Sequence, residues 1–328
     1  MAEPIITQKT DIINNINWAI APQFTSADYF SQGIARVKFS SDGKVGYIDK
    51  TGKIIIAPQF DYGDNFKEDL ARIKHNEQWG FINQKGTVII PAKFTEAMSF
   101  SQGLAAVKIK DKWGFINKTG QIVIPDKYDE VYPFTQGMAG VKMGNKWGFI
   151  NQKGAEIIKL QFTQIDNFTE GFAPVSLNEK WGFINQKGQI IIPLKFDEVQ
   201  NFAEGLAGVK IGDQFGYINQ NGQTVIKPNF DIVWPFNQGI AKVKLDQKYG
   251  YINKKGNLII QPKFDLAWNF SQGIAVVKIG KKYGYIDTKG KFIFPPQFDY
   301  ADTSSEGLLL VKINHTLGYI FNPFVPKP

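Results

Sequence analysis

The sequence contains no cysteine and only two histidines among its 328 residues. Without cysteine the chain can form neither a disulfide framework nor a thiolate metal site. The two histidines, His75 and His315, do not stand at equivalent places in the repeat described below. We therefore expect no metal site and no cofactor.

Long apolar runs are also missing. No stretch of eighteen or more apolar residues occurs, so we expect no membrane-spanning helix. The first residues, MAEPIITQKTDIINN, lack the basic region and apolar run of a secretory signal. The sequence as written predicts a cytoplasmic protein, and a secreted or envelope-associated one is the alternative if a targeting segment has been removed.

The composition is that of a folded protein: 43% of the residues are hydrophobic, 14% aromatic and 21% charged. No linker or shift in composition divides the chain, which favours a single domain. Its formal net charge is +8 and its pI is near 9.2. This excess of positive charge keeps anionic partners among the candidate ligands.

One glycine recurs every 34 residues, each time after a large apolar residue and before an aromatic one. The nine positions are Gly46, Gly80, Gly114, Gly148, Gly182, Gly216, Gly250, Gly284 and Gly318. A fixed period of this length is typical of repeat architectures. We predict a lead segment over residues 1–17, one domain of nine units over 18–320 and a tail over 321–328.

The third unit shows what each copy contains. Alternating apolar residues predict a strand over 104–109, and a second strand is expected over 113–117, joined to the first by a tight turn at Lys110 and Asp111. A third strand is expected over 121–124, ending at Pro125 because proline cannot donate to a ladder. Residues 128–134 are either a short fourth strand or an ordered loop.

The two ends of the array complement each other. Residues 18–30 correspond to the back half of a unit and residues 307–320 to a front half. Together they make a complete ninth unit, as a ring requires when its terminal strands join in one sheet. We predict an all-β repeat protein of nine antiparallel β-meander units in a closed, β-propeller-like ring. The alternative is an open β-solenoid or superhelix.

The hexapeptide Lys-Trp-Gly-Phe-Ile-Asn stands at 112–117, 146–151 and 180–185. It resembles the WG-repeat family of bacterial proteins, and the resemblance extends from Trp18 to Ile320. This resemblance implies a β-rich interaction module with no catalytic residues to transfer. Because Val45, Phe215 and Leu317 replace the tryptophan in other units, we interpret the motif aromatics as core.

A lysine recurs in the first strand of eight units, and Lys108, Lys142, Lys210, Lys244 and Lys278 are our candidates from this series. Displayed together, these lysines could attract a polyanion such as nucleic acid. The alternative is solvated charge that protects strand edges from pairing with other chains. The recurring aspartates, such as Asp129, alternate with threonine, which favours a turn-capping role over catalysis.

Two positions vary from unit to unit. The first holds Asp64, Met98, Tyr132, Asp166, Gln200, Trp234, Trp268 and Asp302, and the second holds Arg36, Arg72, Ala106, Gly140, Pro174, Gly208, Lys242, Val276 and Leu310. We expect Tyr132, Trp234 and Trp268 to be binding anchors, with the two tryptophans near each other because they lie in adjacent units. The alternative is an apolar cover over the loop at Pro235 and Phe236. Uneven packing explains the second series most simply.

No paired carboxylates, phosphate loop, serine elbow or metal-ligand spacing stands out. We therefore expect a non-enzymatic scaffold that recognises a protein partner through surface loops and variable positions. Binding of a glycan or the cell envelope through the same aromatics is the first alternative, and polyanion binding through the lysines is the second. A hydrolase with a site at the mouth of a central channel is the remaining enzymatic alternative.

Overall fold

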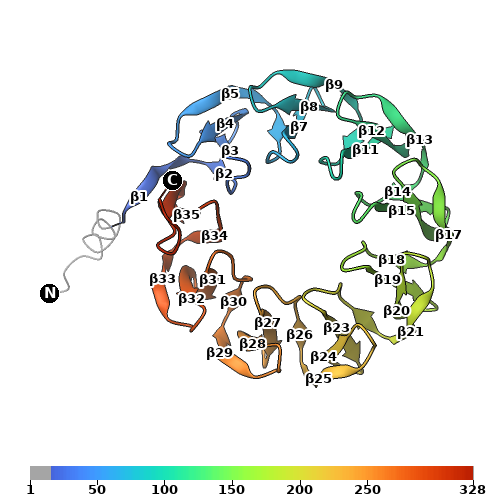
Figure 1. Ribbon diagram of the computed structural model, residues 1–328. Helices are drawn as coiled ribbons and strands as arrows, with labels where there is room; N and C mark the ends of the chain where they lie inside the picture. Colours follow the sequence, from blue (N-terminus) through green and yellow to red (C-terminus); the bar gives the residue numbers. More distant parts are fainter. Residues whose placement is uncertain (1–15, 328) are drawn as a thin grey trace.

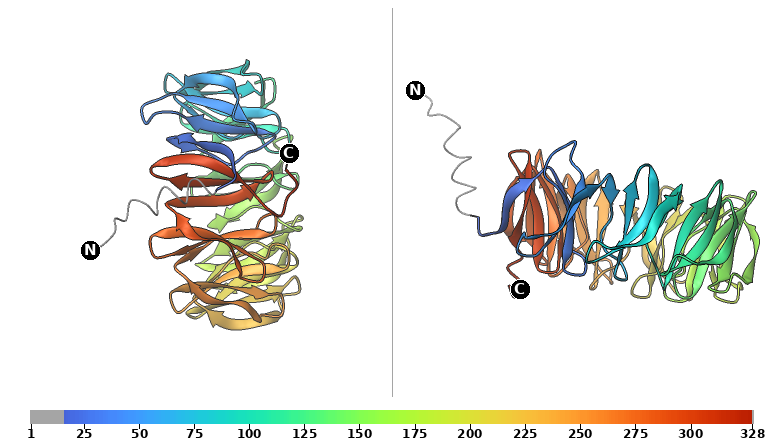
Figure 2. Two further views of the ribbon diagram at one scale, coloured as in Figure 1. Left: turned by 90° about the vertical axis from the view of Figure 1, so that its left-hand side faces the viewer. Right: turned by 90° about the horizontal axis from the view of Figure 1, so that it is seen from above.

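The computed structural model describes residues 16–327, which form nine four-stranded antiparallel sheets. The sheets follow one another around a common axis, as the blades of a nine-bladed β-propeller do (Figure 1). The further views show that the blades together form a thick disc (Figure 2). The prediction of an all-β fold built from nine repeats is confirmed.

Within blades one to eight the strands run in sequence order from the axis to the outside of the ring, and in the ninth blade β34, β35 and β36 are followed by β1 (Figure 1). The innermost strands are β2 (Ser26–Ala27), β6 (Tyr62–Gly63), β10 (Glu96–Ala97), β14 (Glu130–Val131), β18 (Gln164–Ile165), β22 (Glu198–Val199), β26 (Ile232–Val233), β30 (Leu266–Ala267) and β34 (Tyr300–Ser305). The second strands are β3 (Ile34–Lys38), β7 (Leu70–His75), β11 (Leu104–Ile109), β15 (Met138–Met143), β19 (Phe172–Leu177), β23 (Leu206–Ile211), β27 (Ile240–Leu245), β31 (Ile274–Ile279) and β35 (Leu308–Ile313).

The third strands carry the repeated glycine, and the fourth lie on the outside. The third are β4 (Val45–Asp49), β8 (Gln78–Asn83), β12 (Lys112–Asn117), β16 (Lys146–Asn151), β20 (Lys180–Asn185), β24 (Gln214–Asn219), β28 (Lys248–Asn253), β32 (Lys282–Asp287) and β36 (Thr316–Phe321). The fourth are β5 (Ile54–Phe60), β9 (Val88–Phe94), β13 (Ile122–Tyr128), β17 (Glu156–Phe162), β21 (Ile190–Phe196), β25 (Thr224–Phe230), β29 (Leu258–Phe264), β33 (Phe292–Phe298) and, from the start of the chain, β1 (Trp18–Phe24).

The first two predicted strands of the third unit are confirmed by β11 and β12. They pair without interruption from Leu104 opposite Asn117 to Ile109 opposite Lys112. The turn between them has a positive φ at Lys110 (54°), as expected for a two-residue hairpin loop.

The predicted end of the third strand at Pro125 is wrong, since β13 continues to Tyr128. The missing N–H of Pro125 costs no ladder bond, because β13 is the outer edge of its sheet. The pairing with β12 also shifts register on both sides of Phe115, so proline falls in an irregular part of the ladder.

The closing segment of each unit is a short strand that belongs to the next sheet. Glu130 and Val131 form β14, which pairs with β15 through Glu130 opposite Lys142. The repeat unit in the sequence is therefore out of phase with the blade in space, because each copy supplies the innermost strand of the following blade.

The core lies between neighbouring blades. In one cluster, Trp113, Phe115 and Ile124 of the third blade pack on Phe134 and Val141 of the fourth. The predicted core role of the motif aromatic is confirmed for this residue, as Trp113 is only 7% exposed. A single blade has two apolar faces and needs a neighbour on each side, which explains why the units stack.

The ninth blade joins the two ends of the array, as predicted. Strand β1 pairs with β36, with Trp18 opposite Ile320 and Phe24 opposite Leu317. Across the junction with the first blade, the hydroxyl of Tyr319 donates to the carbonyl of Asp28 at 2.6 Å. The blades follow one another around a ring, so the open-superhelix alternative is not supported. The closed-ring prediction is supported only in part, because each blade is a separate sheet and no sheet closes on itself.

Asn322, in the predicted tail, is 1% exposed and donates through Nδ2 to the carbonyl of Gln272 at 3.1 Å. Most of the predicted lead segment, residues 1–15, lies outside the described residues. In the part of the chain that the structure describes, no helix is long and apolar enough to cross a membrane.

Candidate functional site

The two variable positions of the repeat contact each other within each of the first eight blades. The backbone N–H of Trp234 donates to the carbonyl of Lys242 at 3.1 Å, and Trp268 bonds to Val276 in the same way at 3.0 Å. In the first blade the same pair is Asp28 and Arg36, which form an ion pair at 2.6 Å. Residues at the two positions therefore have to fit each other.

Tyr132 shows how such a pair fills space. Its ring stacks on Trp147, with centroids 5.1 Å apart and planes at 16°. Its partner is Gly140, where an added Cβ would lie 2.9 Å from Tyr132 Cδ2 and 2.5 Å from Ile165 Cδ1. Tyr132 is thus half-buried against its own blade and packed on Trp147, so its ring does not stand free on the surface.

Trp234 lies beside a lysine rather than a small residue. The Nζ of Lys242 is 4.1 Å from the centroid of the Trp234 ring, and the ring of Tyr249 is 5.6 Å away on the same blade. The ammonium group also donates to the carbonyl of Ala267, in the eighth blade, at 2.9 Å. Burial lowers the pKa of Lys242 to about 8.

Trp268 stands at the equivalent place in the eighth blade. Its ring packs on Tyr283 at 5.8 Å, and Tyr283 in turn lies 5.7 Å from Tyr300 of the ninth blade. Among the described residues no ring contact joins Trp234 to Trp268, and Lys242, which lies over Trp234, reaches the eighth blade at Ala267, next to Trp268. Both tryptophans are half-buried.

Buried tyrosines of the preceding blades hold the backbone at both tryptophans. The hydroxyl of Tyr217 donates to the carbonyl of Trp234 at 2.8 Å, and that of Tyr251 to the carbonyl of Trp268 at 2.7 Å. Each hydroxyl satisfies a buried polar group. The positions of the two tryptophans are therefore fixed by the framework.

The five candidate lysines of the series divide into two classes. Three of its members form ion pairs with a glutamate directly opposite on the innermost strand: Lys108 with Glu96 (2.7 Å), Lys142 with Glu130 (2.5 Å) and Lys210 with Glu198 (2.8 Å). Lys244 and Lys278 face Ile232 and Leu266 instead. Within residues 16–327, no carboxylate oxygen lies within 4.0 Å of Lys242, Lys244 or Lys278.

These residues define the blade 7–8 site, which consists of Trp234, Lys242, Lys244, Trp268 and Lys278. Strands β27 and β31 supply the lysines, and the tryptophans follow strands β26 and β30. The nearby carboxylate of Asp265 is already engaged by Lys248 at 2.5 Å and by the N–H of Gly280 at 2.6 Å. The site thus combines two half-buried indoles with three cations that have no ion-pair partner in the described part of the chain.

An outer rim of the disc, which was not among the predicted sites, consists of the fourth strand of blades one to eight with the loop before it. Its residues are 49–60, 83–94, 117–128, 151–162, 185–196, 219–230, 253–264 and 287–298. The rim contains sixteen lysines and four acidic residues, so it accounts for more than the entire +8 charge of the chain. Exposed aliphatic residues such as Ile122 (54%) and Ile190 (54%) lie among the lysines. The pattern of two aliphatic residues, proline, any residue and lysine, at 89–93, 123–127 and 191–195, was the signal that could have revealed it.

The acidic series has the structural role that was expected of it. Asp129 accepts the N–H of Gly144, in the next hairpin turn, at 2.7 Å. The pKa of Asp129 is lowered, first by its hydrogen bond from Lys112 and then by this turn N–H. Threonine behaves differently at this place, because Thr95 Oγ1 donates to the carbonyl of Lys108 at 3.1 Å. No group of three potential metal ligands occurs among residues 16–327.

Comparison with known families settles which repeat this is. The family of WG-containing repeats matches residues 17–43, 46–79, 79–113, 113–147, 147–181, 181–214, 215–249, 249–283 and 283–314. The chain belongs to the WG-repeat family. Since these nine matches cover nearly the whole chain, the resemblance noted from the hexapeptide is confirmed.

Solved propeller structures resemble this chain in fold. A eukaryotic initiation factor aligns with a TM-score of 0.60 at 13% identity, over 85% of this chain and 91% of that one. The dihydro-heme d1 dehydrogenase NirN aligns at 0.49 and 13% identity, over 84% and 75%, and Hsv2 of Kluyveromyces lactis at 0.42 and 9%, over 78% and 94%. No curated protein matches the sequence. The likeness to the initiation factor shows the fold alone, and a fold decides neither binding nor catalysis.

Proposed function

We propose that this protein is a non-enzymatic scaffold that binds an acidic segment of a protein partner at the blade 7–8 site. The observation that carries the proposal is that Lys244 and Lys278 form no ion pair with any described residue, where three other blades hold glutamate–lysine pairs. Carboxylates of a partner would take the place of the missing glutamates. Trp234 and Trp268 would supply apolar contact area beside them.

The arrangement suits recognition because its parts are held in place before a partner arrives. The tyrosine hydroxyls fix the backbone at both tryptophans, and Lys242 is already bonded to the eighth blade. Little ordering is then needed on binding, which favours affinity. The same rigidity supports a scaffold role, because a partner meets a surface that is already ordered.

Glycan binding is less well supported by the geometry. A sugar ring stacks on a free aromatic face, yet the ammonium of Lys242 lies over Trp234. Tyr132 is stacked on Trp147 in the fourth blade. The candidate aromatics are therefore edges of packed clusters rather than open platforms.

Polyanion binding is a second candidate function, and the outer rim favours it over the inner lysine series. The rim lysines greatly outnumber the acidic residues there, whereas Lys108, Lys142 and Lys210 are neutralised by ion pairs. Binding through the rim would weaken steeply with salt.

The experiment compares proteins captured from native extract by immobilised full-length chains, at low and at high salt. The test variants are Trp234→Ala with Trp268→Ala, and Lys244→Ala with Lys278→Ala. Lys108→Ala with Lys142→Ala is the matched control, since those lysines are paired. A partner kept at high salt by the wild type and the control, and lost by both test variants, supports the proposal. Equal capture by all four folded proteins overturns it, and capture only at low salt assigns the binding to the rim.

A further inference from the structure

One contact recurs at eight of the nine junctions between blades. The glycine of the loop before each outer strand lies over a buried isoleucine of the preceding outer strand. At Gly120, for example, an added Cβ would lie 3.2 Å from Ile90 Cγ2. The pairs are Gly52 on Ile20, Gly86 on Ile56, Gly120 on Ile90, Gly154 on Ile124, Gly188 on Ile158, Gly222 on Ile192, Gly256 on Ile226 and Gly290 on Ile260.

The junction between the eighth and ninth blades breaks this pattern. The outer strand of the ninth blade, β1, comes from the other end of the array, so no loop connects it to β36. The residue in the isoleucine position of β33 is Phe294, opposite Tyr285. Within residues 16–327 no loop glycine covers Phe294, which remains half-buried.

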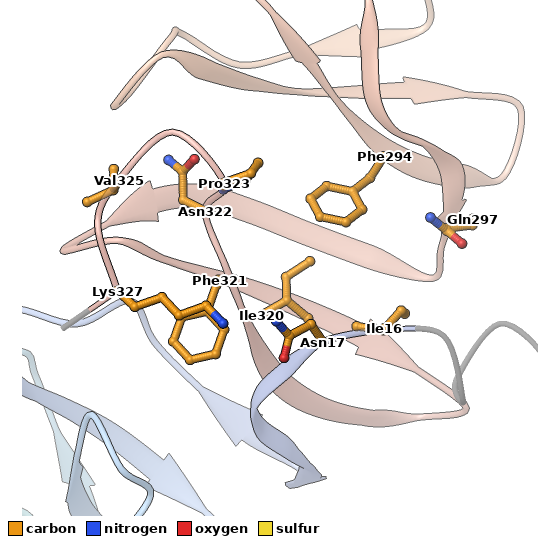
Figure 3. A pocket seen from close by; sticks show the side chains of 10 residues that line it. All are labelled: Ile16, Asn17, Phe294, Gln297, Ile320, Phe321, Asn322, Pro323, Val325 and Lys327. Atoms are coloured by element: carbon orange, nitrogen blue, oxygen red, sulfur yellow. The ribbon is translucent and has the colours of Figure 1, made fainter.

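A cavity of about 640 Å³ occupies this place. Figure 3 shows Phe294, Ile320 and Ile16 around it, together with Phe321, the last residue of β36, and Val325, in the chain after β36. Its walls are mostly apolar, and its volume lies in the range of small-molecule sites. The cavity therefore follows from the way the ninth blade is assembled from two distant segments.

Lys327 places a cation at this cavity. It lines the cavity and extends over the ring of Phe321, with Nζ 4.8 Å from the ring centroid. No carboxylate lies within 4.0 Å of this ammonium group within residues 16–327. The other polar groups of the lining include the uncharged amides of Asn17 and Gln297. Among the described residues, the charge at the cavity is thus positive and unneutralised.

We propose that this cavity binds a small amphiphile with one apolar chain and an anionic head, of the fatty-acid class. The chain would lie against Phe294, Ile320 and Phe321, and the carboxylate would bond to Lys327. An apolar cavity favours the chain because it removes the chain from water. The lysine favours an anionic head over a neutral or cationic one.

The test is isothermal titration of the full chain with dodecanoate, below the concentration at which it forms micelles. We expect one saturable site per chain. Butyrate, which has a short chain, and dodecylamine, which has a cationic head, should each bind at least about tenfold more weakly. Absence of saturable binding, or equal binding of dodecanoate and dodecylamine, overturns the proposal.

Variants separate the cavity from general surface charge. Lys327→Glu should weaken dodecanoate binding by about tenfold or more, since it replaces an attraction with a repulsion. Lys263→Glu is the matched control, because Lys263 also lies over a ring, that of Phe264, at 5.3 Å. Phe294→Glu, in protein whose folding is confirmed by circular dichroism, should abolish binding. Equal losses of dodecanoate affinity in Lys327→Glu and Lys263→Glu would assign the affinity to the charged rim and refute the cavity site.

Discussion

The carboxylate of Glu306 accepts the backbone N–H of Gly33, at 3.1 and 3.2 Å from its two oxygens, across the junction between the ninth and first blades. Lys50 pairs with the same carboxylate at 2.8 Å. Within the array, Glu68 accepts the N–H of Gly103 at 2.9 Å in the same way. The kind of contact that joins neighbouring blades within the array therefore also joins the ninth blade to the first.

Removing this carboxylate should loosen the junction. We expect Glu306→Ala to lower the free energy of unfolding by about 1–3 kcal/mol, because an N–H in a partly buried position loses a charged acceptor. Urea denaturation measures the change, and hydrogen exchange of the β1 amides reports local opening. Glu68→Ala is the control inside the array and should cost a similar amount. If Glu68→Ala lowered the free energy of unfolding and Glu306→Ala did not, this carboxylate would not be what holds the ninth blade to the first.

The repeated glycine should tolerate no side chain. A Cβ on Gly114 would lie 2.6 Å from the carbonyl oxygen of Ile124 and 2.8 Å from the nitrogen of Asp126. These are backbone atoms of the adjacent strand, so relief requires β13 to move. We expect Gly114→Ala to destabilise the fold by about 2–3 kcal/mol.

The control for this substitution is Gly144→Ala in a hairpin turn. Gly144 has a positive φ of 57°, and nothing lies within 4 Å of an added Cβ. Its cost should be limited to the strain of alanine in that conformation, about 1 kcal/mol. Thermal and urea unfolding compare the two variants, and equal destabilisation would rule out the close approach as the reason for the motif glycine.

Local features of the fold could be predicted from the sequence. The period, the hairpin at Lys110 and the joining of the two ends follow from short-range patterns that recur nine times. The predicted third strand ends too early. The prediction stopped the strand at Pro125, because proline lacks the N–H that a strand inside a sheet would donate. Only the edge position of β13 in its sheet shows why Pro125 is accepted there.

The candidate site was harder to predict, since it depends on contacts between positions far apart in the repeat. Trp234 and Lys242 belong to separate series in the sequence, although the structure brings them together. The neutralisation of Lys108 by Glu96 depends on a strand pairing that the sequence patterns do not predict. The cavity beside Phe294 exists because a loop is missing at one junction, which no local pattern reveals.

Lys242 should make stability rise with pH. Its ordinary pKa is 10.5, and burial lowers the pKa to about 8 in the folded chain. Between these values the unfolded chain binds more protons than the folded one, so raising the pH favours folding. Because the side chain is only partly buried, we expect a gain of about 1 kcal/mol between about pH 7.5 and about pH 9.5, less than the full shift implies.

The comparison for this prediction is Lys242→Met, which keeps an apolar stem and removes the titrating group. The difference in unfolding free energy between wild type and variant should grow in favour of the wild type across that range. The range ends below about pH 10, because burial raises the pKa of tyrosines such as Tyr217 and unfolding then releases their protons. A difference that stays constant with pH would show that Lys242 titrates normally.

The outer rim should dominate any affinity for polyanions. Lys85, Lys153 and Lys187 belong to the rim, whereas Lys108, Lys142 and Lys210 are paired with glutamates. Changing the three rim lysines to glutamate should lower the salt concentration that elutes the chain from immobilised heparin. The slope of the salt dependence should also fall by about one unit for each lysine that no longer binds an anionic group. The same change at the three paired lysines should have a smaller effect, since each already has a counter-charge. Equal shifts in the two triple variants would mean that heparin senses only net charge, and a larger shift for the paired lysines would return the polyanion surface to the inner strands.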